Sequence, residues 1–258
     1  MAEGAEEITK RLTAIDFESS FKDIGWLDLG HNERGDKVWK RKPERENTDS
    51  TTLKFESAPI KADLLTLVAL IRESQLGSLA GKLLLWNPVD KSPFERQIHY
   101  CSYFPFPFQN RDFCIKEHCG GIQDSDGQLS IVLLNYDADE KSYMQRLYPS
   151  DINQELMAEF LKSNKIHGNV NYSIYFITKI SDDECKLRRY FSINMHLPWS
   201  FPRFAQDKAL GNVFMENIQW IRSEAGKYKT HQDLPEPYQE VIRNNALYPA
   251  LSEFLRNN

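Results

Sequence analysis

The sequence after Pro93 contains five segments with the composition of β-strands, and some of them are joined by very short polar connections. The tetrapeptides Asp-Ser-Asp-Gly (124–127) and Ser-Asp-Asp-Glu (181–184) are two such connections. Connections this short require the strands that they join to be antiparallel neighbours, because a parallel crossover needs about a dozen residues or more. The sequence therefore predicts a long antiparallel sheet. Its five strands are expected at residues 96–104, 112–119, 129–136, 169–180 and 185–196.

Amphipathic helical patterns flank this β-rich region. The longest one covers residues 203–227, where Leu210, Val213, Phe214 and Ile221 share one face. An apolar stripe of this length needs the face of a sheet to cover it, so the pattern predicts an α+β protein in which a curved antiparallel sheet closes over a long C-terminal helix. Such an arrangement readily leaves an internal cavity. Further helices are expected at 8–24, 64–77 and 150–164, as a short piece running into Trp86, and in the last thirty residues or so, and two or three strands are expected between 26 and 56.

Composition excludes several classes of protein. The chain of 258 residues is 41% hydrophobic and can bury a large core, and its formal net charge of -5 argues against a nucleic-acid partner. No apolar run approaches the roughly 18 to 20 residues of a membrane-spanning helix. The N-terminus lacks the pattern of a secretory signal, so a cytoplasmic location is expected. The four cysteines show no disulfide framework and are expected to be reduced.

Motifs that carry catalysis or bind phosphate are absent from the sequence. A zinc site made by His99, Cys101, His118 and Cys119 is conceivable, since these residues fall on neighbouring predicted strands. However, adjacent residues of a strand point to opposite faces, so at most half of these groups could converge. We therefore expect no metal, no cofactor and no catalytic residue.

Residues 103–117 carry the most specific pattern, Tyr-Phe-Pro-Phe-Pro-Phe-Gln-Asn-Arg-Asp-Phe-Cys-Ile-Lys-Glu. This segment resembles the strand-turn-strand signature of the START family (StAR-related lipid transfer domains), in which a proline-containing turn leads into Asn-Arg-Asp-Phe or Asn-Arg-Asp-Tyr. Trp86-Asn87 before the segment and Leu197-Pro198 before the long helix are also similar to the family pattern, whereas Asn194-Met-His-Leu replaces its usual Asp-x-x-Gly. The resemblance implies a helix-grip fold. It divides the chain into an N-terminal extension (1–16), a START-like domain (17–227) and a C-terminal tail (228–258).

The function that this resemblance implies is that of a non-enzymatic carrier or sensor. Such a protein encloses one lipid, either a phospholipid, a sterol, a sphingolipid or a fatty acid, and contacts membranes transiently as a monomer. Two alternatives stay open at this point. The chain could be a helix-grip enzyme of the cyclase or hydrolase kind, for which His99, Glu117 and His196 are the only candidate titratable groups. It could also be a scaffold domain whose cavity is filled by side chains.

The residues that line the expected cavity follow from the family's inward parity at the signature and from the period of two in a strand. Two charges, Glu117 and Arg189, then lie on an otherwise apolar surface, where each needs a partner in the other, in water or in the polar head of a lipid. The amide of Asn217 lies on the helix stripe and also requires a partner. On residues 169–180, the apolar set Val170, Tyr172, Ile174 and Phe176 is predicted to point inward. The complete predicted lining is Tyr100, Phe113, Ile115, Glu117, Tyr172, Arg189, Phe191, Ile193, Leu210, Phe214 and Asn217.

Two further sets of residues receive other roles. The signature residues Asn110, Arg111 and Asp112 are expected to fix the hairpin by hydrogen bonds rather than to touch a ligand. The resemblance places the mouth of the cavity beside the C-terminal helix, where Trp199 and Phe201 lie between Pro198 and Pro202. Prolines prevent strand pairing there, and aromatic rings suit the headgroup region of a bilayer, so Trp199 and Phe201 are predicted to form a membrane gate.

Overall fold

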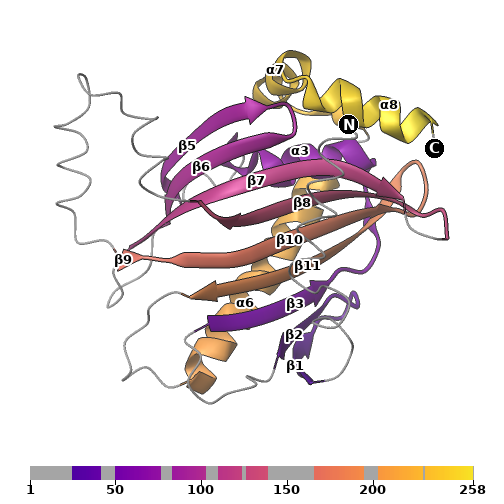
Figure 1. Ribbon diagram of the computed structural model, residues 1–258. Coiled ribbons are helices and arrows are strands. Elements are labelled where there is room, and N and C mark those ends of the chain that lie inside the picture. The colour runs from indigo at the N-terminus through magenta and orange to yellow at the C-terminus, as the bar shows by residue number, and fades with distance from the viewer. Residues whose placement is uncertain are drawn as a thin grey trace, which may run out of the picture.

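The computed structural model describes residues 25–41, 50–76, 83–102, 110–123, 126–138, 166–194, 203–228 and 230–257. Within these ranges the chain forms a curved sheet of eleven strands, with the order β1-β2-β3-β11-β10-β8-β7-β6-β5 along its main path (Figure 1). Neighbours on this path are antiparallel, and the short strands β4 and β9 pair with β11 and β7. The strands are β1 (Trp26–His31), β2 (Lys37–Arg41), β3 (Ser50–Glu56), β4 (Ile60–Lys61), β5 (Leu83–Ser92), β6 (Glu95–Ser102), β7 (Arg111–Gln123), β8 (Leu129–Asp137), β9 (Ile166–His167), β10 (Asn169–Lys179) and β11 (Glu184–Asn194).

The five strands predicted after Pro93 are confirmed as β6, β7, β8, β10 and β11, and the early strands as β1, β2 and β3. The prediction of a helical piece running into Trp86 is wrong. Trp86 lies in β5, opposite Tyr100 of β6 in the antiparallel register. Pairing with β6 supplies hydrogen-bond partners for this stretch, and tertiary pairing of that kind overrides a local helical pattern.

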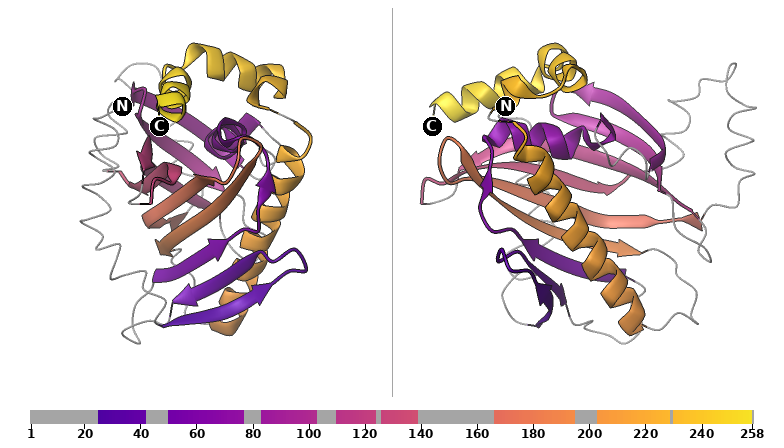
Figure 2. Two further views of the ribbon diagram at one scale, coloured as in Figure 1. Left: turned by 90° about the vertical axis from the view of Figure 1, so that its right-hand side faces the viewer. Right: turned by 180° about the vertical axis from the view of Figure 1, so that it is seen from behind.

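Two helices cover one face of the sheet, which we call the inner face. They are α3 (Leu64–Arg72), followed by the short η1 (Ser74–Leu76), and α6 (Arg203–Ala225), which crosses the strands on the concave side (Figure 2). Phe214, Ile218 and Ile221 of α6 pack with α3 and with inner-face residues of the sheet in the main hydrophobic core. Near the C-terminal end of α6, Arg222 forms a 2.5 Å ion pair with the buried Asp36 and donates to the carbonyl oxygen of Pro59. These contacts hold α6 against the sheet, as the predicted α+β fold requires.

The opposite face of the sheet, the outer face, also buries apolar side chains. Val132 and Leu134 of β8 are fully buried there, together with Ile174 and Phe176 of β10 and Tyr190 of β11. The central strands are therefore apolar on both faces. In strands of this kind, the alternation of apolar and polar residues does not tell the inner face from the outer one.

A β-bulge in β10 decides which of its residues face inward. Val170 pairs with Ile193 of β11, but the next pair is Tyr172 with Ser192, so Asn171 has no partner in the ladder. The side-chain amide of Asn171 donates to the hydroxyls of Ser50 and Ser192, which holds the extra residue in place. Because one inserted residue shifts the alternation by one position, every residue after it points to the face opposite to the one that simple counting gives.

The C-terminal residues fold back over the same core. The segment contains η3 (His231–Asp233), α7 (Glu236–Asn244) and α8 (Leu247–Asn257), which lie above the edge formed by β5, β6 and β7 in Figure 1. Leu247, Tyr248 and Leu251 are buried in the main core with α3 and α6. The packed core thus extends past residue 227. The helices predicted at 8–24 and 150–164 lie outside the described residues.

Candidate functional site

One end of the inner face is lined by apolar side chains from four strands. Ile98 of β6, Phe113 and Ile115 of β7, Val170 of β10 and Ile193 of β11 form a buried cluster. Tyr100 and Phe191 pack against this cluster and keep part of their surface uncovered. The ring of Tyr100 stacks on that of Phe113, with centroids 4.9 Å apart. The predicted inward placement of Tyr100, Phe113, Ile115 and Ile193 agrees with this geometry.

Arg189 lies on the inner face between this cluster and α6. Its guanidinium carbon lies 4.3 Å from the ring centroid of Tyr175, 4.5 Å from that of Phe191 and 5.2 Å from that of Phe214 on α6. The rings of Phe191 and Phe214 are themselves 5.4 Å apart. Aromatic faces attract a cation, but they do not neutralise its charge. The guanidinium of Arg189 therefore lies next to three aromatic rings on the concave side of the sheet.

The hydrogen bonds of Arg189 are few. Its Nε and Nη2 both donate to the hydroxyl oxygen of Ser173, at 3.1 and 3.0 Å. Among the described residues, no carboxylate forms an ion pair with Arg189, and its hydrogen bonds to Ser173 use Nε and Nη2. Burial lowers the pKa of Arg189 from its ordinary value, and the phenols of Tyr175 and Tyr100 oppose that shift in part. The direction of the shift indicates a cation removed from water without a counter-charge.

Two buried side-chain amide oxygens have no hydrogen-bond partner in the described part of the chain. Asn135 of β8 stands directly opposite Ser173 of β10 in the register, so both point to the inner face. The Asn135 side chain is 7% exposed, and its Oδ1 makes no hydrogen bond. On α6, the Oδ1 of Asn217 is likewise buried without a partner, one turn beyond Phe214. Buried polar atoms normally have a partner in protein or bound solvent, so these two oxygens are exceptions among the described residues.

Glu117 lies on the inner face, as predicted, but not beside Arg189. Its carboxylate pairs with two arginines, Arg72 at the end of α3 at 3.0 Å and Arg96 of β6 at 2.7 Å. Glu73 closes the group, because it pairs with the same two arginines at 3.1 and 3.0 Å. Of the partners considered for Glu117, Arg189 is therefore excluded, because Arg72 and Arg96 take that place. The reason is that the last turn of α3 delivers Arg72 to the sheet and satisfies Glu117 internally.

This four-residue cluster is balanced in charge and sealed from water. Burial alone would lower the pKa of Arg72, but the carboxylates of Glu117 and Glu73 outweigh that effect and raise it. Burial would raise the pKa of Glu73, whereas Arg96 and Arg72 bring it below its ordinary value. From α8, the hydroxyl of Tyr248 donates to Glu73 at 3.4 Å. The cluster thus joins α3, β6, β7 and α8, and its charges are used within the protein.

Tyr172 does not lie with the other predicted lining residues. The bulge at Asn171 places Tyr172, Ile174 and Phe176 on the outer face, where they pack with Tyr190 and Val132. The inward prediction for these three residues is wrong. Ser173 and Tyr175 take the inward positions instead, which is why both contact Arg189.

The remaining predicted lining residues come from α6. Phe214 is buried, with its ring 5.9 Å from that of Phe55 on β3. Asn217 is partly buried on the same helix. Leu210 belongs to α6, but its side chain is outside the described part of the structure, and the predicted gate residues Trp199 and Phe201 lie outside the described residues altogether.

The signature residues stand at the start of β7, where three strands meet. Arg111 pairs with Ser102 of β6 on one side and with Ile166 of β9 on the other. Its side chain is buried, and burial lowers its pKa. The backbone carbonyl oxygen of Asp112 accepts a hydrogen bond from the backbone N–H of Gly168. The carboxylate oxygen Oδ2 of Asp112 lies 3.6 Å from Nε2 of His99. Asn110 immediately precedes the strand.

Catalytic and metal-binding constellations do not assemble in the described part of the chain. His99 pairs in register with Cys114, whose parity places it on the outer face, whereas Glu117 is on the inner face, so these two enzyme candidates do not converge. His196 lies outside the described residues. No group of three or more His, Cys, Asp or Glu side chains there could hold a metal ion, and no helix of that part is long and apolar enough to span a membrane.

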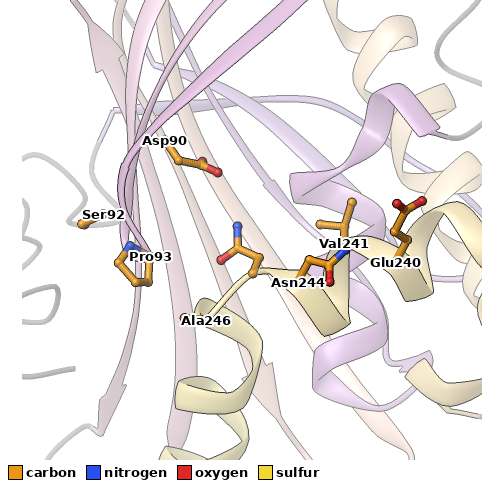
Figure 3. Close-up of a pocket in the computed structure, with 8 residues that line it drawn as sticks. Asp90, Ser92, Pro93, Glu240, Val241, Asn244 and Ala246 are labelled. Carbon is orange, nitrogen blue, oxygen red and sulfur yellow. The ribbon is translucent and has the colours of Figure 1, made fainter.

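A separate pocket of about 430 Å³ lies between the β5–β6 hairpin and the C-terminal helices. Figure 3 shows Asp90, Ser92 and Pro93 on one wall and Glu240 and Val241 on the other. None of the inner-face residues around Arg189 contributes to this pocket. The two places are therefore distinct.

The class that this arrangement defines is the helix-grip fold of StAR-related lipid transfer domains, and three solved structures of such domains resemble the chain. Human STARD10 superimposes with a TM-score of 0.66 at 13% sequence identity, over 92% of this chain and 85% of that chain. The lipid transfer and protein localization domain of human StarD13 (DLC2) has a TM-score of 0.56 at 14% identity, and the match covers 83% of this chain and 95% of that chain. Human StAR-related lipid transfer protein 5 has a TM-score of 0.56 at 12% identity, and the match covers 87% of this chain and 99% of that chain. No family model and no curated protein sequence matches the chain significantly.

Sequence reasoning missed Ser173, Tyr175 and Asn135. For the first two, the bulge reverses the parity, and both faces of β10 are apolar enough to hide the reversal. Asn135 did carry a signal, since it interrupts the apolar run Ile-Val-Leu-Leu of β8. Arg72 also carried one, because it lies four residues after Val68 on the buried side of α3.

Proposed function

We propose that this protein encloses one lipid between the inner face of the sheet and α6, and that it carries or senses that lipid without changing it chemically. The observation that carries the proposal is the uncovered surface of Tyr100, Tyr175, Arg189 and Phe191, which lie on the inner face and stay only partly buried. A filled core would cover these side chains completely.

The chemistry of this surface suits an amphipathic molecule. Aromatic and aliphatic side chains provide most of it, and a few polar groups, namely Arg189, Ser173 and Asn135, interrupt it. Pockets for apolar ligands have this composition, because apolar area supplies affinity and a small number of polar groups fixes orientation. The likeness to lipid transfer domains supports the same proposal.

Membrane contact belongs to this proposal, since a lipid leaves a bilayer only where the carrier touches it. We place that contact at Trp199 and Phe201, in a cytoplasmic protein that visits membranes transiently. Substitution Trp199→Ala should then slow lipid transfer between vesicles and weaken vesicle binding, while the melting temperature changes by only a few degrees. A large loss of stability without a transfer defect would move the contact elsewhere.

Two tyrosines of β10 provide a matched test of the carrier. Tyr175 faces α6 and Tyr172 faces outward, three residues apart on one strand. In an assay that measures extraction of a fluorescent phospholipid from vesicles, Tyr175→Ala should change the extracted amount several-fold and Tyr172→Ala should leave it unchanged. Equal effects of the two substitutions, at equal melting temperatures, would contradict binding on the inner face. A wild-type protein that extracts no lipid of any class would favour the scaffold alternative.

A further inference from the structure

We propose that the inner face binds the acidic head of its lipid, a group with a single negative charge, through Arg189, Tyr175, Ser173 and Asn135. This inference rests on the proposed function and adds the chemical class of the ligand to it. The two groups that fit are a carboxylate, as in a fatty acid, and a phosphodiester, as in an anionic glycerophospholipid. A neutral lipid such as a sterol or a diacylglycerol lacks the charge that the site requires.

The first step concerns charge balance on the inner face. Arg72 and Arg96 are matched by Glu73 and Glu117 in the closed cluster, so their charges cancel. In the described part of the chain, Arg189 has no carboxylate partner, and its guanidinium carbon lies within 5.2 Å of three aromatic ring centroids. A partly buried cation of this kind is stabilised when another group supplies the opposite charge. One free cation calls for one negative charge.

The second step concerns the direction in which the guanidinium of Arg189 presents its N–H groups. Nε and Nη2 of Arg189 both donate to the hydroxyl oxygen of Ser173, which fixes the plane of the guanidinium and leaves Nη1 for another acceptor. The outward-turned side of such a fork presents parallel N–H groups, and these match the two oxygens of a carboxylate or phosphate. The ring of Tyr175 lies 4.3 Å from the guanidinium carbon, so its hydroxyl can donate to the same group.

The third step is the buried amide of Asn135. It stands opposite Ser173, is 7% exposed and lacks a hydrogen-bond partner. An amide can present either its NH₂ group or its oxygen after a half-turn, so it can donate to an anion beside Ser173. A site that only needed apolar packing would lose nothing with leucine here. The polar residue therefore indicates a bound polar group.

The fourth step places the tail of the lipid. The apolar cluster of Ile98, Phe113, Ile115 and Ile193 continues from Arg189 toward the start of β7, and Tyr100 and Phe191 connect the two regions. On the other side, the main core of α3 and the C-terminal half of α6 is closed by buried side chains. The acyl chain therefore extends along the apolar cluster, with the acidic head held at Arg189.

A competition experiment tests the inference. Full-length protein is incubated with vesicles that contain equal amounts of oleate, dioleoyl phosphatidylglycerol, diolein and cholesterol, is re-isolated, and its bound lipids are quantified by mass spectrometry. Wild type should retain oleate, phosphatidylglycerol or both in excess over the neutral lipids, and the ratio of the two acidic lipids distinguishes carboxylate from phosphodiester. Arg189→Gln should reduce the excess by about tenfold to a hundredfold, the range for a charged hydrogen-bonded contact.

Matched variants separate this result from a folding defect. Arg188→Gln, on the outward side of the same strand beside Phe176, should leave the lipid ratio unchanged. Tyr175→Phe keeps the ring and removes one donor, and should reduce the excess several-fold. Two outcomes overturn the inference but not the proposed lipid-carrier function. One is wild type that retains neutral lipids as well as acidic ones, and the other is an excess of acidic lipid that persists in Arg189→Gln. Wild type that retains none of the four lipids overturns the proposed function as well.

Discussion

Tyr175 and Arg189 stand directly opposite each other on β10 and β11, and the guanidinium carbon of Arg189 lies 4.3 Å from the ring centroid of Tyr175. This contact exists because the bulge at Asn171 turns Tyr175 inward. It places a cation, an aromatic ring and a hydroxyl on the concave surface beneath α6. The candidate site is thus a consequence of one inserted residue in one strand.

Replacing Arg189 by leucine should not destabilise the lipid-free protein. The charge has no carboxylate partner in the described part of the chain, and replacing a buried ion by an apolar side chain of similar volume is often neutral or stabilising. The melting temperature of delipidated Arg189→Leu should equal or exceed that of delipidated wild type. A fall of many degrees would mean that Arg189 has an internal partner and would argue against a ligand role.

Glu117→Gln, unlike Arg189→Leu, should destabilise the protein. The substitution leaves Arg72 and Arg96 with only Glu73, so one positive charge of a buried cluster becomes unpaired. Breaking such a group typically costs about 3 to 5 kcal/mol of unfolding free energy. Denaturant unfolding measures this loss, and the ratio of bound acidic to neutral lipid should stay as in wild type. A changed ratio with unchanged stability would return Glu117 to the ligand site.

Strands β8 and β10 show which parts of the structure can be predicted from the sequence and which cannot. The strands, the long helix and the inward side of β6, β7 and β11 follow from alternation and from the signature at Asn110, Arg111 and Asp112. On β10 alternation fails, because Ile174 and Val132 are buried on the outer face as completely as Ile177 is on the inner one. The bulge that decides between the faces depends on hydrogen bonds from Asn171 to Ser50 and Ser192, and these pairings form only in the folded sheet.

The internal ion cluster shows the same limit for long-range contacts. Glu117 was correctly placed inward, but Arg72 lies 45 residues earlier in the chain, on a helix. A period of two along a strand contains no information about which helix covers it. The pairing of α3 with β6 and β7 therefore has to come from the structure.

Gly121→Ala should destabilise the protein through α8. A Cβ atom at Gly121 of β7 would lie closer to the ring of Phe254 than real Cβ contacts allow, so that ring or the helix α8 that carries it would have to shift. We expect a loss of about 1 to 3 kcal/mol in thermal or denaturant unfolding, the range for overpacking.

Gly211→Ala is the control for that substitution. A Cβ atom at Gly211 of α6 meets only Leu29, at 3.8 Å, which is ordinary contact. Alanine in a helix is favoured over glycine by about 0.5 to 1 kcal/mol, so this variant should gain stability. If Gly121→Ala is as stable as wild type, α8 does not pack on β7 as described.

The contact between His231 and Asp63 should make stability depend on pH. Asp63 caps α3 by accepting from the backbone of Thr66, and it also accepts from the Nδ1 of His231 at 2.8 Å. The hydrogen bond to Asp63 raises the pKa of His231 above 6.5. Burial alone would raise the pKa of Asp63, but its hydrogen bonds, those with His231 first, bring it below 3.8.

The sign of each shift fixes the pH window. A raised histidine pKa gives stability that is complete below about pH 6.5 and is lost as pH rises through the folded-state value. A lowered aspartate pKa gives stability that is present above about pH 3.8 and is lost as pH falls through the folded-state value. Melting temperature should therefore fall as pH rises above about 6.5 in wild type, and this fall should be smaller in His231→Gln. Identical profiles for the two proteins would exclude the contact as a source of stability.

Native mass spectrometry of the intact protein, purified from cells without detergent or added lipid, tests the central claim most directly. The account predicts a dominant species heavier than the chain by the mass of one lipid. On release, that lipid should be identified as one with a single acidic group. A folded protein that appears only at the mass of its own chain, before and after incubation with vesicles, would contradict the claim that the inner face encloses a lipid.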